Sequence, residues 1–188
     1  MAVNYANSWV EICNRSLGRL GKGRIDDLVS GGELAQYCNL YLGEAIEYVL
    51  SSLEWNGLRH RVELARSSTD PVYGYSYAYV LPLDLVTITD VENDGEDFVI
   101  EGDRLLTEAD EVYVTYIPRP DSPAVLPGYL KKCVSTHLAF LLATPLTVSD
   151  QLRALLMQED QMAMNAAIQA DGHRSYPIPA DSWYGDSR

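Results

Sequence analysis

The sequence predicts an α+β protein: a four-helix bundle, with two N-terminal and two C-terminal helices, and a β-rich insertion between the second and third helices. Three observations lead to this class. Apolar residues recur at helical spacing near both ends of the chain, they alternate in the middle, and Gly and Pro cluster where the pattern changes. We therefore expect residues 1–57 and 126–170 to form the bundle, 58–125 the acidic insertion, and 171–188 an extended C-terminal segment.

The two N-terminal helices are separated by a glycine-rich loop. The first helix is expected to follow an Asn7 cap and to end at Gly21, because glycine is the residue that most often terminates a helix. The second begins near Glu33 and carries a continuous apolar face.

The two C-terminal helices follow a proline-rich stretch, residues 117–128. The last helix starts near Thr147, where Thr-Val-Ser-Asp has a capping-box pattern, and it is rich in alanine. We expect Leu138 and Leu155 to be buried in the bundle.

The central region alternates as strands do. Alternation is weak over residues 58–64 and clear over 75–81, 85–91 and 112–117. The tight-turn sequence Asn93-Asp94-Gly95 predicts a hairpin between two of these strands.

Tyrosine occupies every second position at Tyr75, Tyr77 and Tyr79, so one face of a predicted strand is aromatic. Two explanations are open. The rings cover a small core, or at least one of them meets another protein chain, since tyrosine is enriched at interfaces.

Charge is distributed unevenly. The formal net charge is −13, from 27 acidic and 14 basic residues, and thirteen acidic residues but only two arginines lie between positions 67 and 130. Such a surface repels nucleic acid and anionic membranes. Basic residues gather at the end of the first helix: Arg15, Arg19, Lys22 and Arg24.

No sequence motif indicates catalysis or a cofactor, so we expect a structural or binding protein and not an enzyme. The three cysteines are widely spaced among apolar residues, which predicts neither a disulfide framework nor a zinc site. His137 falls on an apolar helix face and is expected to be a core histidine. The sequence has neither the features of a signal peptide nor an apolar run long enough to span a membrane.

Two alternatives stay open. A chain this acidic offers carboxylates that a tail-associated cell-wall glycan hydrolase would use in pairs. A small calcium-binding module is the other, because DVENDGEDFVIE nearly matches an EF-hand loop at Asp90, Glu92, Asp94, Gly95 and Glu101. Predicted strands, and not helices, flank that loop, and we expect no bound metal.

The order of several motifs resembles the phage tail tubular protein A family, the head-to-tail adaptors of short-tailed phages. The resemblance covers about residues 5–170. It rests on four segments: NRSLGRLGKGRIDDLVSGGELAQYCNLYLGEAIEYVLSSLEWNGLRHRVELA, YAYVLPLDLVTITDV, FVIEGDRLLTEADEVYVTYI and the closing LAFLLATPLTVSDQL. The chain departs from the family pattern at Val86, where arginine is favoured, and at Glu54, where proline usually precedes the tryptophan.

The resemblance implies a structural virion protein of the neck or tail, assembled in the host cytoplasm. Family members form a ring, usually of twelve copies, between the portal and the tail nozzle, and the double-stranded genome passes through it without specific binding. In this setting the tyrosine face is a candidate subunit interface. Portal docking is expected of the basic cluster and of three aromatic residues near the C-terminus: Tyr176, Trp183 and Tyr184.

Overall fold

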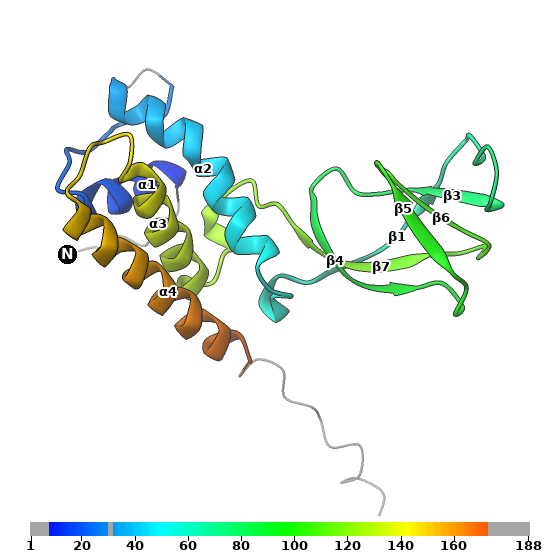
Figure 1. Ribbon diagram of the computed structural model, residues 1–188. Helices are drawn as coiled ribbons and strands as arrows, with labels where there is room; N and C mark the ends of the chain where they lie inside the picture. Colours follow the sequence, from blue (N-terminus) through cyan, green and yellow to red (C-terminus); the bar gives the residue numbers. More distant parts are fainter. Residues whose placement is uncertain (1–7, 30–31, 173–188) are drawn as a thin grey trace, which may run out of the picture.

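The computed structural model describes residues 8–29 and 32–172, and Figure 1 shows the helices packed together at one end and the strands at the other. The elements in chain order are α1 (Trp9–Arg19), α2 (Glu33–Ser51), the short helix η1 (Asn56–Leu58), β1 (His60–Glu63), β2 (Ala65–Arg66), β3 (Tyr77–Val80), β4 (Leu85–Glu92), β5 (Phe98–Glu101), β6 (Arg104–Thr107), β7 (Tyr113–Pro118), the short helix η2 (Pro123–Val125), α3 (Gly128–Leu142) and α4 (Asp150–Gly172). We call the helical elements the helical part and β1 to β7 the β part.

The α+β class is confirmed, but the prediction of a four-helix bundle with an insertion is wrong. In a bundle, each helix packs against two neighbours around a shared axis. Here α3 is the central helix, and α1, α2 and α4 each pack mainly against α3 rather than against one another. The strands also share the helical core, because Ile117 of β7 is buried in it and Val86 of β4 packs against it. The division at residues 57, 125 and 170 stays a prediction.

The burial of α3 explains the difference. Every residue from 133 to 139 is buried, so the middle of this helix is enclosed on all sides and not along one stripe. Its buried polar groups have partners on other helices: the Thr136 hydroxyl donates to Asp160 of α4 at 3.1 Å, and the Ser135 carbonyl accepts from the Ser16 hydroxyl of α1 at 2.8 Å. A helix that is buried on all sides in its middle is the centre to which the other helices pack, whereas a bundle helix keeps one polar face in water.

On α4, the apolar residues do not all face the core. Leu156 is buried, whereas its neighbour Leu155 is 59% exposed, so the expectation that Leu155 is buried was wrong. Consecutive helix residues point about 100° apart, and the buried positions Leu156, Ala163 and Ala167 define the stripe that meets α3. The small alanines on this stripe let the two helices approach closely.

The ends of α1 follow standard capping chemistry. Its cap is Ser8 and not Asn7, because the Ser8 hydroxyl and Glu11 form a reciprocal capping box. At the other end Gly21 has a φ of 66°, and the Lys22 amide donates to the carbonyl of Leu17 at 2.9 Å. The predicted glycine stop is therefore confirmed as a Schellman motif.

The β part consists of two antiparallel sheets, with strand orders β1-β7-β4 and β2-β3-β6-β5. β1 and β2 are almost one strand, which passes from the first sheet to the second at Leu64. A small core lies between the sheets, formed by Leu64, Tyr79, Leu81, Leu105, Ala109, Val112, Val114 and Tyr116.

The predicted turn at Asn93-Asp94-Gly95 forms, but the predicted hairpin does not. Asp94 and Gly95 both have positive φ, 57° and 81°, and the Glu96 amide donates to the Asn93 carbonyl. This is a type I′ geometry. The flanking strands β4 and β5 belong to different sheets, so the turn is a corner between sheets.

A buried carboxylate ties the end of α4 to the chain entering the β part. Asp171 is 1% exposed and accepts hydrogen bonds from the Asn56 and Gly57 amides, at 2.8 and 3.2 Å, and from the Tyr129 hydroxyl at 2.7 Å. It thereby fixes the segment that leads from α2 into β1.

Candidate functional site

Of the three alternating tyrosines, Tyr79 belongs to the core of its own chain. It is 2% exposed, and its hydroxyl donates to the carbonyl of Ala109 at 2.8 Å. Burial raises the pKa of its phenol, because a buried phenolate is poorly solvated. For this residue, the explanation that the ring covers a small core is the one the structure supports.

Tyr77 and Tyr75 have more open positions. The Arg66 guanidinium lies over the Tyr77 ring at 3.8 Å from the centroid, a cation–π contact between β2 and β3. A hydrogen bond to Asp110 raises the pKa of the Tyr77 phenol. Tyr75 precedes β3 and lines a surface hollow with the exposed Val72 and Tyr73. Interface roles for these two tyrosines stay a prediction.

The basic residues at the end of α1 have three different surroundings. Arg19 forms an ion pair with Glu159 at 3.0 Å, which joins α1 to α4. Arg15 and Arg24 line one surface hollow. They come together because the Asn14 side chain exchanges two hydrogen bonds with the backbone of Ile25, at 2.8 and 2.9 Å, and so folds the following loop back onto the helix. Lys22 is exposed. We call Arg15, Arg19, Lys22 and Arg24 the basic corner.

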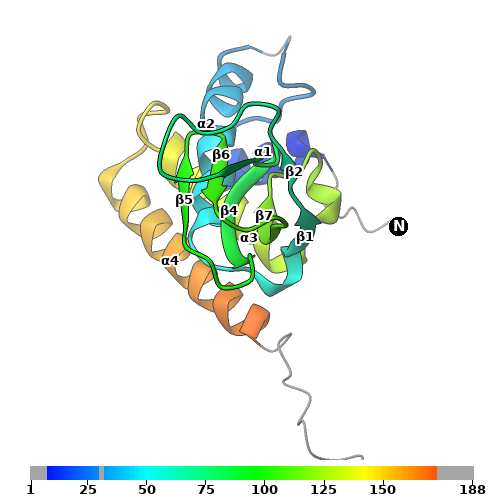
Figure 2. The ribbon, with the colours of Figure 1, turned by 90° about the vertical axis from the view of Figure 1, so that its right-hand side faces the viewer.

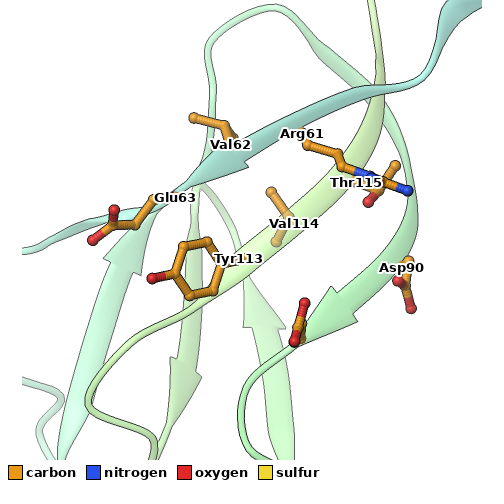
Figure 3. A pocket seen from close by; sticks show the side chains of 8 residues that line it. Arg61, Val62, Glu63, Asp90, Tyr113, Val114 and Thr115 are labelled. Carbon is orange, nitrogen blue, oxygen red and sulfur yellow. The ribbon is translucent and has the colours of Figure 1, made fainter.

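An open hollow of about 370 Å³ lies on the outer face of the first sheet (Figure 3). It crosses β1, β7 and β4, and its lining residues are Arg61, Val62, Glu63, Asp90, Glu92, Tyr113, Val114 and Thr115. The Tyr113 hydroxyl donates to Glu111 at 3.1 Å, and this bond, with the nearby charges of Glu111, Glu63 and Glu92, raises the pKa of the phenol. The hollow therefore combines apolar, acidic and basic groups, and four of its eight lining residues are charged.

The residues that resemble an EF-hand loop are divided between two sheets. Asp90 and Glu92 lie on β4, Asp94 and Gly95 form the corner turn, and Glu101 ends β5. Within residues 8–29 and 32–172, no group of three or more metal-ligating side chains is found. The stretch is thus a strand, a turn and a strand, and it lacks the helix–loop–helix context of that motif.

His137 is a core histidine, as expected, and the structure adds the partner that the sequence did not indicate. Its Nδ1 lies 2.7 Å from the Asp160 carboxylate of α4, and its ring stacks on Tyr48 of α2 at 3.9 Å between centroids. This side chain therefore joins α3 to α2 through ring stacking and to α4 through a polar contact.

Asp171 was also not identified from the sequence as a buried hydrogen-bond acceptor, although its position in the helix offers a signal. A carboxylate at a helix C-terminus is unfavourable because the helix dipole is negative there, so an acidic residue in the last turn suggests a specific partner. Tyr176, Trp183 and Tyr184 lie outside the described residues.

No protein-family model matches the chain, and no curated protein matches it in sequence. In the described part of the chain, each helix is too short or too polar to cross a bilayer.

Proposed function

We propose that this chain is a structural virion protein, a head-to-tail adaptor that forms a ring between a portal and a tail nozzle. The proposal begins from the ordered motifs described above, which extend through both parts of the fold. YAYVLPLDLVTITDV forms β3 and β4, and FVIEGDRLLTEADEVYVTYI forms β5, β6 and β7.

The observation that carries the proposal is the separation of charge along the molecule. The basic corner lies on α1 and the loop that follows it in the helical part. The acidic residues concentrate in the β part, which Figure 1 shows projecting from the helices on the side away from α1. An adaptor contacts two different proteins and therefore needs different chemistry at its two ends. Complementary potentials select partners and fix orientation.

The acidic β part also suits a conduit for a nucleic acid. DNA carries dense negative charge, and a wall that binds phosphate would hold the genome in place. Carboxylates repel phosphate, so a ring that exposes them to its channel lets the duplex slide. This role needs no catalytic group and no cofactor.

Portal docking is assigned in this proposal to the basic corner and to Tyr176, Trp183 and Tyr184. Arginine, tryptophan and tyrosine are the residues that most often dominate interface energetics. Ring formation is expected to depend on the portal, because a template aligns subunits whose mutual contacts are weak.

The test is binding to the portal protein encoded by the same genome. The purified chain is mixed with portal rings, and mass per particle is measured by sedimentation and by electron microscopy. We expect a ring of this protein on one end of the portal, and weaker attachment after removal of residues 173–188 or after the double change Arg15→Glu and Arg24→Glu.

Glu44→Arg supplies the matched control, since Glu44 is an exposed carboxylate on α2, outside both proposed docking regions. A wild-type chain that does not associate with the portal at tens of micromolar would refute the adaptor function. Release of glycan fragments from cell walls by the same preparation would favour a hydrolase instead.

A further inference from the structure

Strand β5 carries apolar residues that the chain leaves partly exposed. All four of its residues, Phe98 to Glu101, are exposed, and Val99 and Ile100 are 40% and 46% accessible. It lies at the edge of its sheet, where β6 is its strand neighbour. An apolar edge strand with one open side is a template for pairing with another strand, because its outward N–H and C=O groups lack a ladder.

Strand β1 has the same features at an edge of the other sheet. Its four residues, His60 to Glu63, are all exposed, Val62 among them at 37%. It pairs with β7, and Figure 3 shows Arg61, Val62 and Glu63 along it, beside the hollow on the outer face of the sheet. Among the described residues, β1 and β5 are thus edge strands of equal length, one in each sheet, and β4 and β2 form the other two edges.

The segments that contain the two edge strands differ in charge, although β1 itself carries one arginine and one glutamate. Residues 94–103 contain five acidic residues and no basic one, whereas residues 59–66 contain three arginines and one glutamate. Pairing β5 with β5 of a second copy would place like charges together, and like charges across a strand pair are destabilising. Pairing β5 with β1 of a second copy places Glu101 and its acidic neighbours against Arg59 and Arg61.

The placement of the two edges makes such a contact directional. In Figure 2, β5 and β1 lie on opposite sides of the β part, with β6, β4 and β7 between them. A copy that offers β5 to one neighbour keeps β1 open for the next. Contacts of this head-to-tail kind generate rings when the rotation closes.

We propose that copies of this chain associate by pairing edge strand β5 of one copy with edge strand β1 of the next, so that the sheets continue from subunit to subunit and the acidic segment 94–103 meets the basic segment 59–66. Main-chain hydrogen bonds supply the affinity, and the charges select β1 over a second β5. The pairing itself needs no portal; its closure into a ring rests on the proposed function.

Cross-linking tests the pairing even where the contact is weak. Val62→Cys and Ile100→Cys each place a thiol on one exposed edge, while the native cysteines Cys13, Cys38 and Cys133 are buried. A short bismaleimide is added to each variant alone, to their mixture, and to the unchanged protein as a control. We expect linked dimer in the mixture, at least about fivefold above either variant alone, because like-charge edges do not pair.

Charge-reversal variants then test whether opposite charges on β5 and β1 select the pairing. Arg61→Glu in the Val62→Cys chain, or Glu101→Arg in the Ile100→Cys chain, should each lower the linked yield about fivefold or more, and the two together should restore it. Glu44→Arg in either background should leave the yield unchanged. Restoration separates a charge contact from simple damage to a strand.

Failure of this inference and failure of the adaptor function give different results. No linked dimer in the mixture at about millimolar concentration, or equal yields in the single-variant samples, overturns the β5–β1 pairing. Linked dimers that do not bind portal rings leave the pairing standing and refute the adaptor function. Portal-bound rings in which positions 62 and 100 do not cross-link keep the function and overturn the pairing.

Discussion

The helical part and the β part of this molecule use their apolar residues differently. In the helical part, α3 is enclosed and most large apolar side chains face one continuous core. In the β part, the core between the sheets is small, and every residue of β1 and β5 is exposed. The larger part of the hydrophobic core therefore belongs to the helices, and the strands leave surface available for other molecules.

The largest expected effect comes from the centre of the helical core. Leu138→Ala removes a fully buried side chain from α3 and should lower the free energy of unfolding by ~2–5 kcal/mol, from lost transfer energy and from the cavity. Leu155→Ala on α4 is the matched control, because its side chain is exposed, and it should change stability by less than ~0.5 kcal/mol. Denaturant unfolding measures both, and equal losses would show that α3 is not the centre of the core.

The junction between the two parts should be the next most sensitive place. Asp171→Ala removes the buried carboxylate that accepts from the Asn56 and Gly57 amides and from the Tyr129 hydroxyl, and should cost about 3 kcal/mol. Asp171→Asn keeps one oxygen acceptor and should cost less. Faster hydrogen exchange at the Asn56 and Gly57 amides checks the assignment, and unchanged exchange there would contradict it.

Alkaline pH should weaken the helical core through Cys133. Burial, followed by the charge of Asp160, raises the pKa of this thiol from 9.0 to about 11. The folded chain holds the proton more tightly than the unfolded chain, so this contribution is complete below pH 9 and is lost as the pH rises toward 11, on the order of 2 kcal/mol in all.

The check is the pH dependence of denaturant unfolding. Cys133→Ala removes the titrating group. The free energy of unfolding of this variant should therefore fall less between pH 9 and pH 11 than that of the unchanged protein. Parallel losses in the two proteins would mean that Cys133 does not titrate within the core.

A smaller effect is expected in the β core. Tyr79→Phe keeps the ring but removes the hydroxyl that donates to the Ala109 carbonyl, which should cost about 1 kcal/mol. Tyr75→Phe serves as the control, since Tyr75 lies outside the strand, and it should change stability by no more than a few tenths of a kcal/mol. If both substitutions had the same effect, Tyr79 would not differ from a surface tyrosine.

Salt should produce the smallest effect, and it should arise in the β part. Carboxylates crowd the corner between β4 and β5, at Asp94, Glu96 and Asp97, and their repulsion is screened by added ions. Raising the salt concentration should therefore stabilise the chain by a few tenths of a kcal/mol. Replacing these three carboxylates by their amides should remove most of that gain, and an undiminished gain would place the repulsion elsewhere.

Local signals in the sequence determined several features by themselves. The Gly21 stop and the Asn93-Asp94-Gly95 turn were predicted correctly, because both depend on backbone conformations that glycine and its neighbours adopt without help from distant residues. The α+β class followed from the change in apolar period, and the core position of His137 followed from its apolar helix face.

Tertiary structure alone decided how these pieces meet. Periodicity shows that a helix has an apolar face, but not whether α3 is the central helix or one member of a bundle, nor which of the adjacent Leu155 and Leu156 faces inward. The same turn residues serve a hairpin or a corner between sheets, since strand partners are chosen by packing over long distances. The open edges of β1 and β5 likewise became visible only once the strand order was known, because an edge is a property of the sheet and not of the strand.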